Sequence, residues 1–119
     1  MSNYFFTADE HYAHKNIIKF CNRPFSTLEE MNETLIERHN SVVKDGDTVI
    51  HVGDFCFLST YEQVNRYFLT RLTGKHILLK GSHDHFMRSS KNKDICQVWS
   101  SNIGDNFVVV SHLSLIHIY

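Results

Sequence analysis

At 119 residues the chain has the length of a single domain. Its hydrophobic content of 42% is typical of globular proteins and argues against disorder. The net charge of -1 offers no general attraction to nucleic acid or to an anionic membrane, so neither is an expected partner. The N-terminal residues lack signal-peptide features, and no apolar run approaches the ~18 residues of a membrane span. Three cysteines without CxxC spacing then predict a cytoplasmic protein with free thiols.

The first half of the chain is predicted to form a strand, two helices and a turn. The strand covers 3–8, and a short helix over 13–21 is ended by Arg23-Pro24-Phe25. A longer helix begins at Thr27-Leu28-Glu29-Glu30, which fits the capping-box pattern. Asp45-Gly46-Asp47 is a turn signal. Apolar residues of the longer helix recur at spacings of three, four and seven, which predicts a stripe that packs on a sheet. They are Leu28, Met31, Leu35, Ile36, Val42 and Val43.

The second half alternates strands and helices in the same way. A strand over 48–52 is followed by a second capping box, Ser59-Thr60-Tyr61-Glu62, and Gly74 is expected as the C-cap of that helix. The expected buried side of the helix consists of Tyr61, Val64, Phe68 and Leu72. Further strands are predicted over 76–79, 95–99 and 106–110. This alternation predicts an α/β domain.

Clusters of polar residues follow three of the predicted strands. They are Asp9-Glu10-His11, Gly53-Asp54 and Gly81-Ser82-His83-Asp84. Asp9 and His11 are two residues apart, so on an extended segment both side chains would point to the same side. Asp54 could bridge two ions, because a carboxylate offers two oxygens. A single Asp is more often a turn or cap residue, but ligands in α/β proteins sit at strand ends, so the ordered set predicts a two-metal hydrolytic centre. Carboxylate and imidazole ligands suit Mn, Fe, Zn or Ni.

These clusters resemble the motifs of the calcineurin-like metallophosphoesterases: D-x-H, G-D, G-N-H-D or -E, a later H, and G-H-x-H. The matching segments are Asp9-Glu10-His11, Gly53-Asp54, Gly81-Ser82-His83-Asp84 and Val110-Ser111-His112. Residues 11–18, 22–25 and 30–33 further resemble a small branch of the family that is common in bacteria and phages. The resemblance covers essentially residues 3–112.

The resemblance implies a β-sandwich flanked by helices (α/β/β/α), here lacking its C-terminal strands, and a substrate that is a phosphomonoester or phosphodiester. It implies two divalent metal ions, with Mn expected first. One ion would be held by Asp9, His11 and Asp54. The other would be held by Asp54, Ser82 and His112.

The remaining roles also follow from the resemblance. His83 would act as the general acid, and Asp84 would orient its imidazole. Two interpretations of His14 stay open: it contacts the substrate phosphate or a metal ligand, or it is an ordinary residue at the start of a helix. Cys56 is interpreted as a small buried residue, and the resemblance implies no role for His51. His39 and His76 lie outside the clusters and are interpreted as ordinary structural or surface residues.

Two departures from the family pattern predict impaired activity. Ser82 stands where the family has Asn, and its shorter hydroxyl should weaken the second metal site. The chain also contains no G-H-x-H, a motif that gives one histidine to each metal. The alternative is therefore a non-catalytic module with the same fold and a degraded metal site.

The end of the chain is expected to be foreign. Leu113-Ser114-Leu115-Ile116-His117-Ile118 corresponds to the translation of a transposase adapter end used in sequencing libraries. Residues 1–112 are accordingly interpreted as a partial metallophosphoesterase domain, and residues 113–119 as a non-native tail that is left out of fold reasoning.

Overall fold

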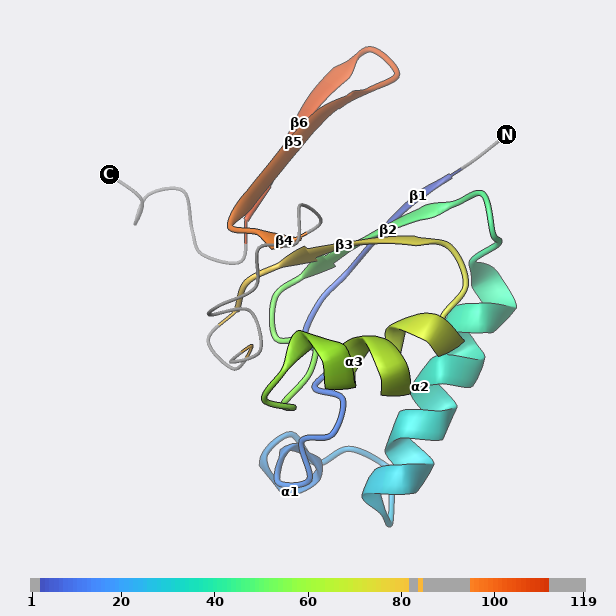
Figure 1. Cartoon of the computed structure of the whole chain (residues 1–119), viewed down its shortest axis with the longest axis vertical. Helices are drawn as coiled ribbons and strands as arrows, with labels where there is room; N and C mark the ends of the chain where they lie inside the picture. Colours follow the sequence, from blue (N-terminus) through green and yellow to red (C-terminus); the bar gives the residue numbers. More distant parts are fainter. Residues whose placement is uncertain (1–2, 82–83, 85–94, 112–119) are drawn as a thin grey trace.

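The computed structural model of the chain describes residues 3–81, 84 and 95–111. It contains a four-stranded parallel sheet and a separate two-stranded hairpin (Figure 1). The elements are, in order, β1 (Tyr4–Thr7), α1 (Ile17–Phe20), α2 (Leu28–Val42), β2 (Thr48–Val52), α3 (Tyr61–Tyr67), the 3₁₀-helix η1 (Leu69–Arg71), β3 (Lys75–Leu79), β4 (Ile95–Cys96), β5 (Val98–Ile103) and β6 (Asn106–Ser111). The predicted α/β class is therefore confirmed.

The parallel sheet has the strand order β1-β2-β3-β4. Parallel neighbours require crossover connections, and the helices supply them: α1 and α2 lie between β1 and β2, while α3 and η1 lie between β2 and β3. In register, Phe6 pairs with Ile50 and Ile50 with Ile77. This arrangement brings the carboxyl ends of all four strands to one edge of the sheet.

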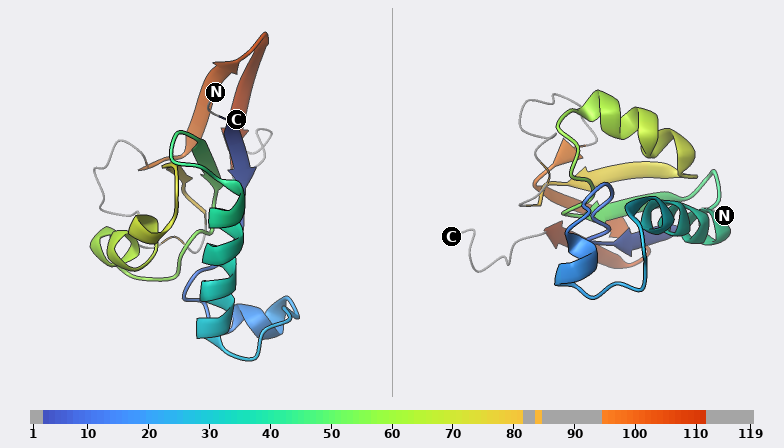
Figure 2. Two further views of the ribbon diagram at one scale, coloured as in Figure 1. Left: turned by 90° about the vertical axis from the view of Figure 1, so that its right-hand side faces the viewer. Right: turned by 90° about the horizontal axis from the view of Figure 1, so that it is seen from below.

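The sheet separates two layers. α2 and α3 cover one face, and the β5–β6 hairpin lies on the other side (Figures 1 and 2). The aromatic ring of Trp99 in β5 lies 6.1 Å from that of Tyr4 and 6.2 Å from that of Phe6, measured between centroids. On the helical side, the main buried cluster comprises Tyr12, Ile36, Phe55, Cys56, Val64, Phe68, Leu69, Leu72 and Leu78.

The two helix starts test the capping predictions. Thr27 caps α2 as expected, since its side chain accepts a hydrogen bond from the Glu30 N–H at 3.1 Å. The second capping box is wrong by one residue. Thr60, and not Ser59, is the N-cap of α3, and its hydroxyl accepts from the Gln63 N–H at 3.2 Å.

Several predicted helix boundaries also differ. The helix expected over 13–21 is limited to α1, because Ala13 has a left-handed φ of 62° that no α-helix contains. Gly74 is not the helix C-cap: α3 ends at Tyr67 and η1 follows, so Gly74 lies in the turn before β3, with φ 94°. In α2 the expected apolar stripe fails at Val42, whose side chain is exposed.

The strand predicted over 95–99 proves to be parts of two sheets. β4 pairs with β3, whereas β5 pairs with β6, and Gln97 lies between them. A continuous run of strand-forming residues does not reveal where the chain changes sheets. The strand predicted over 106–110 is confirmed as β6. The predicted non-native tail, 113–119, lies outside the described residues.

Candidate metal centre

Beyond β1 and β2, the two chain segments continue side by side into the loops that follow. The N–H groups of the first loop donate to the carbonyls of the second. These bonds are Asp9 to Gly53 at 3.1 Å, His11 to Asp54 at 3.0 Å and Tyr12 to Phe55 at 2.9 Å. The pairing thus places the first two polar clusters of the sequence next to each other, just past the carboxyl edge of the sheet.

The backbone at this edge is unusual. Asp9, His11 and Asp54 have φ values of 58°, 55° and 52°, in the left-handed region that residues with a side chain rarely adopt. Gly53, between β2 and Asp54, also has a left-handed φ of 83°. The expectation that Asp9 and His11 lie on an extended segment is wrong, because β1 ends at Thr7. Their side chains converge through the left-handed turns instead.

Asp9, His11 and Asp54 form a cluster in which each residue offers one ligand atom and these atoms all lie within 4.8 Å of one another. His11 Nε2 is 3.7 Å from Asp54 Oδ2. Both residues are buried, with 7% of their surface exposed, whereas Asp9 is exposed. Two carboxylates and one imidazole at this spacing match the oxygen and nitrogen donors that Mn, Fe and Zn accept. The donor set therefore fits a divalent cation.

His14 contacts the imidazole of His11. The two Nδ1 atoms are 3.1 Å apart, and the His14 ring stacks on Phe57 with 4.4 Å between centroids. If His11 uses Nε2 as a ligand, its Nδ1–H donates to His14, as the second nitrogen of metal-binding histidines usually does to a partner. Of the roles left open for His14, the geometry favours support of His11 over a plain helix-start position.

Asp84 holds the backbone of the neighbouring loops. Its Oδ1 accepts from the N–H groups of Phe55 at 2.8 Å and Cys56 at 3.2 Å, and its Oδ2 accepts from Gly81 at 2.9 Å. Burial raises its carboxyl pKa, while these backbone donors act in the opposite direction. The observed contacts therefore give Asp84 a role in fixing the loop beside Asp54, one that sequence reasoning missed.

Glu10 lies between two of the candidate ligands, and its side chain is linked by hydrogen bonds to His51 and, through it, to His76. His76 Nε2 donates to the Leu72 carbonyl at 3.2 Å, and burial lowers its pKa to about 4, so the ring is neutral at pH 7 with Nδ1 as an acceptor. His51 Nε2–H therefore donates to His76 Nδ1, at 2.9 Å. His51 Nδ1 lies 2.5 Å from Glu10 Oε2. This contact joins the Glu10 carboxylate to the buried His51 ring.

This network shows how His51 and His76 are held, and it agrees with the interpretation of His76 as a structural residue. His51 is 1% exposed and His76 is partly buried, and both are hydrogen-bonded in a chain that ends at Glu10. His39 contacts the same group: its ring lies 5.5 Å from that of His76, and its Nε2 bonds the Thr73 carbonyl at 2.8 Å. The nine histidines of the sequence are many for its length, but their number could not predict that His39, His51 and His76 lie together.

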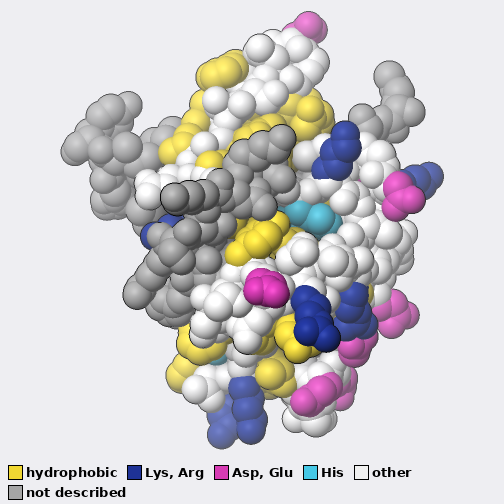
Figure 3. All heavy atoms as spheres, viewed as in Figure 1, with side chains coloured by type: hydrophobic (Ala, Val, Ile, Leu, Met, Phe, Trp, Pro, Cys, Tyr) yellow, Lys and Arg dark blue, Asp and Glu magenta, His cyan; other side chains and the backbone are white. Residues whose placement is uncertain are grey.

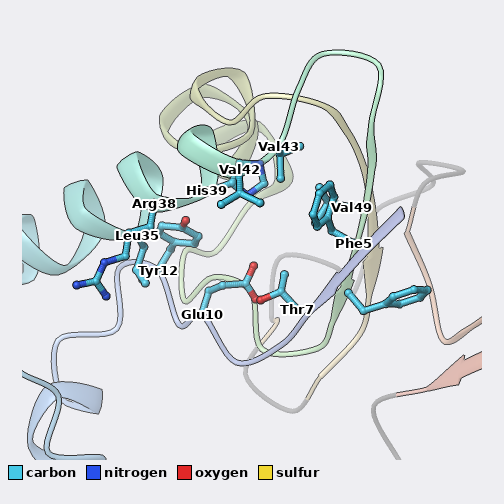
Figure 4. A pocket seen from close by; sticks show the side chains of 11 residues that line it. Phe5, Thr7, Glu10, Tyr12, Leu35, Arg38, His39, Val42, Val43 and Val49 are labelled. Carbon is cyan, nitrogen blue, oxygen red and sulfur yellow. The ribbon is translucent and has the colours of Figure 1, made fainter. Parts of the chain in front are cut away.

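A cavity of about 290 Å³ lies between α2 and β1, on the side of the loop that Glu10 occupies (Figure 4). Glu10 and Tyr12 contribute from the loop after β1, and Arg38, His39 and Val42 from α2. Within the described part of the chain, Glu10 Oε1 is buried without a hydrogen-bond partner. The walls are otherwise largely apolar.

The other predicted site residues have separate outcomes. Ser82, His83 and His112 lie outside the described residues, so their roles stay predictions. Cys56 is 1% exposed, and burial raises the pKa of its thiol to about 12, as suits the predicted small buried residue. A thiol with that pKa is protonated at neutral pH and is a poor metal ligand.

The surface agrees with the modest net charge. On the face shown in Figure 3, Lys and Arg side chains are interspersed with Asp and Glu, and hydrophobic side chains gather on the hairpin. Among the residues that the structure describes, no helix combines the length and apolar character needed to cross a membrane.

Comparisons with known proteins give relatives whose names state no activity. No family model matches the chain. It is 43% identical over 86 residues to the uncharacterized protein MJ1445 of Methanocaldococcus jannaschii, an alignment that covers 72% of this chain and 49% of that protein. It is 33% identical over 102 residues to the Gene 66 protein of Mycobacterium phage L5, covering 83% of this chain and 49% of that protein. The chain thus spans about half the length of the curated relatives it matches.

A solved structure shares the fold. The protein of unknown function AQ665 from Aquifex aeolicus superposes with a TM-score of 0.67 at 24% identity, covering 92% of this chain and 60% of that one. The likeness concerns the arrangement of strands and helices alone.

Proposed function

We propose that the chain is part of a metal-dependent phosphoesterase of the calcineurin-like type, acting on phosphomonoesters or phosphodiesters in the cytoplasm. The observation that carries this proposal is the convergence of Asp9, His11 and Asp54 from two strand ends into one cluster. A layer of helices on one face of the parallel sheet and a hairpin on the other support a helix-flanked sandwich, in which β5 and β6 begin the second sheet.

In this proposal Asp9, His11 and Asp54 hold the first divalent ion, and Asp54 shares the second with Ser82 and His112. Bound divalent ions polarise a phosphoryl oxygen and lower the pKa of a bound water. His83 protonates the leaving oxygen of the ester as a general acid. His14 keeps the His11 ring in place through the Nδ1 contact.

A single-ion binding module without catalysis is the second candidate. It is favoured by Ser82, whose short hydroxyl is a weaker metal ligand than the Asn amide oxygen of the family pattern. The number of ions bound separates the two candidates: the enzyme binds two, and the module binds one and turns over no substrate.

The test is a titration of Mn²⁺ into the parent chain and Asp54→Asn, followed by assay on an aryl phosphodiester and an aryl phosphomonoester. We expect Asp54→Asn to lose metal binding and any hydrolysis while keeping its far-UV circular dichroism. Asp45→Asn, which removes an exposed carboxylate from the turn before β2, is the matched control. Equal Mn²⁺ affinity of Asp54→Asn and the parent would refute the proposed centre.

A further inference from the structure

Arg23 lies in a loop that is distant in sequence from the metal ligands but close to them in space. It follows α1 in the segment Asn22-Arg23-Pro24-Phe25, to which the family resemblance assigns no role. Its own backbone is fixed, because its N–H donates to the Ile18 carbonyl at 2.9 Å and its carbonyl accepts from Phe25 at 2.9 Å. The base of the side chain is therefore anchored.

The guanidinium of Arg23 spans two consecutive carbonyls of the metal loop. One terminal nitrogen donates to the Asp9 carbonyl at 2.6 Å, and the other donates to the Glu10 carbonyl at 2.7 Å. The second nitrogen also contacts Met31 Sδ at 3.5 Å, and Met31 is fully buried in α2. The planar fork of an arginine matches two acceptors held side by side, which a lysine ammonium cannot reproduce.

The loop needs such support because its backbone is intrinsically unfavourable. Left-handed conformations such as those at Asp9 and His11 bring the side chain close to the backbone and are sterically unfavourable. The N–H groups of Asp9 and His11 are held by the loop after β2. Arg23 supplies the complementary bonds to the carbonyl groups, so the two sets of contacts fix the loop from both sides.

We propose that Arg23 is a positioning residue: by holding the carbonyls of Asp9 and Glu10 it keeps loop 9–11 in the shape that binds a divalent cation. The inference rests on the proposed metal site. It adds a positive charge beside a cation site, and that charge alone would weaken cation binding. Charge and positioning therefore predict opposite effects when Arg23 is replaced.

The test compares Arg23→Gln and Arg23→Lys with the parent chain by titration of Mn²⁺. Positioning predicts a loss of about 10–100-fold in affinity for both variants, as is typical when a partner that orients metal ligands is removed. Charge alone predicts tighter binding for Arg23→Gln and no change for Arg23→Lys. Arg38→Gln, which removes an exposed guanidinium from α2, is the control and should not lose affinity.

Amide hydrogen exchange of the metal-free protein provides a readout that does not depend on metal. We expect the N–H groups of His11 and Tyr12 to exchange faster in Arg23→Gln than in the parent and in Arg38→Gln, with urea melts showing that all three are folded. If the parent binds no Mn²⁺, the proposed function fails and the exchange data still decide on Arg23. Unchanged exchange at these two amides, or Mn²⁺ affinity in Arg23→Gln equal to or above that of the parent, would overturn the inference.

Discussion

At the scale of single residues, Gly81 leaves room for Asp54. A Cβ atom at position 81 would lie 2.4 Å from both the backbone N and the Oδ1 of Asp54, far inside van der Waals contact. The backbone of the third polar cluster therefore lies directly against Asp54 of the second. Position 81 needs glycine because a side chain there would clash with Asp54, and not because the backbone is left-handed.

We expect Gly81→Ala to displace the Asp54 carboxylate, to weaken Mn²⁺ binding and to destabilise the fold by about 1–3 kcal/mol, the usual cost of overpacking. Gly46→Ala is the matched control, because a Cβ there would meet nothing within 4 Å. Mn²⁺ titration and urea melts measure both effects. Wild-type affinity in Gly81→Ala would show that the loop can shift without loss of the site.

The buried histidines give the stability of the chain a pH dependence. Burial, followed by the nearby His51, lowers the pKa of His76 from 6.5 to about 4, so the folded state resists protonation where the unfolded state accepts it. Stability is then lost as pH falls from about 6.5 to 4, by up to about 3 kcal/mol from this residue. Burial also lowers the pKa of His39, which acts in the same direction.

His76→Asn keeps a hydrogen-bond acceptor for His51 but cannot titrate. We expect the free energy of unfolding of the parent to fall more steeply than that of His76→Asn between pH 7 and pH 4.5, as measured by urea melts at several pH values. Parallel pH profiles would mean that His76 is as easily protonated in the folded chain as in the unfolded one.

At the scale of elements, the start of α3 distinguishes two adjacent hydroxyl residues. Thr60 accepts the Gln63 N–H, and loss of such a cap typically costs ~1 kcal/mol. We expect Thr60→Ala to destabilise the chain by about this amount, and Ser59→Ala to remain within about 0.5 kcal/mol of the parent. Chemical denaturation of the two variants measures the difference. A larger loss of stability in Ser59→Ala than in Thr60→Ala would show that Ser59 is the N-cap, as the sequence pattern predicted.

The same element shows why helix ends were harder to predict than helix centres. Val64, Phe68 and Leu72 are buried as the periodicity predicted, but Phe68 and Leu72 lie beyond the end of α3, on either side of η1. Burial depends on the direction in which a side chain points, and a 3₁₀ turn can preserve that direction while the hydrogen-bond pattern changes.

At the scale of the whole molecule, Trp99 connects the hairpin to the parallel sheet through Tyr4 and Phe6. We expect Trp99→Ala to cost about 2–3 kcal/mol, below the ~3–5 kcal/mol of a fully buried aromatic residue. Phe107→Ala is the control, because its side chain in β6 is 68% exposed. Trp99 is the one Trp of the chain, so the variant loses the tryptophan fluorescence signal. The urea melts are therefore followed by circular dichroism. Equal stability of the two variants would show that Trp99 does not hold the hairpin.

Local patterns in the sequence were sufficient to predict β1, β2, β3 and β6, the long helix and the polar residues that follow β1, β2 and β3. Side-chain periodicity and capping act over a few residues, and parallel strands must present their ends at one edge. The meeting of Asp9, His11 and Asp54 follows from these rules, although the extended backbone assumed for the first two was wrong.

Tertiary structure alone decided how that edge is supported. Along the sequence, Arg23 is 13 and 14 residues from the two residues whose carbonyls its guanidinium binds, and Glu10 is 41 residues from His51. No local period links such partners, because their contact depends on how the crossover helices return the chain to the sheet. The left-handed turns at Asp9 and His11 are likewise unfavourable locally and exist because distant groups satisfy their N–H and carbonyl groups.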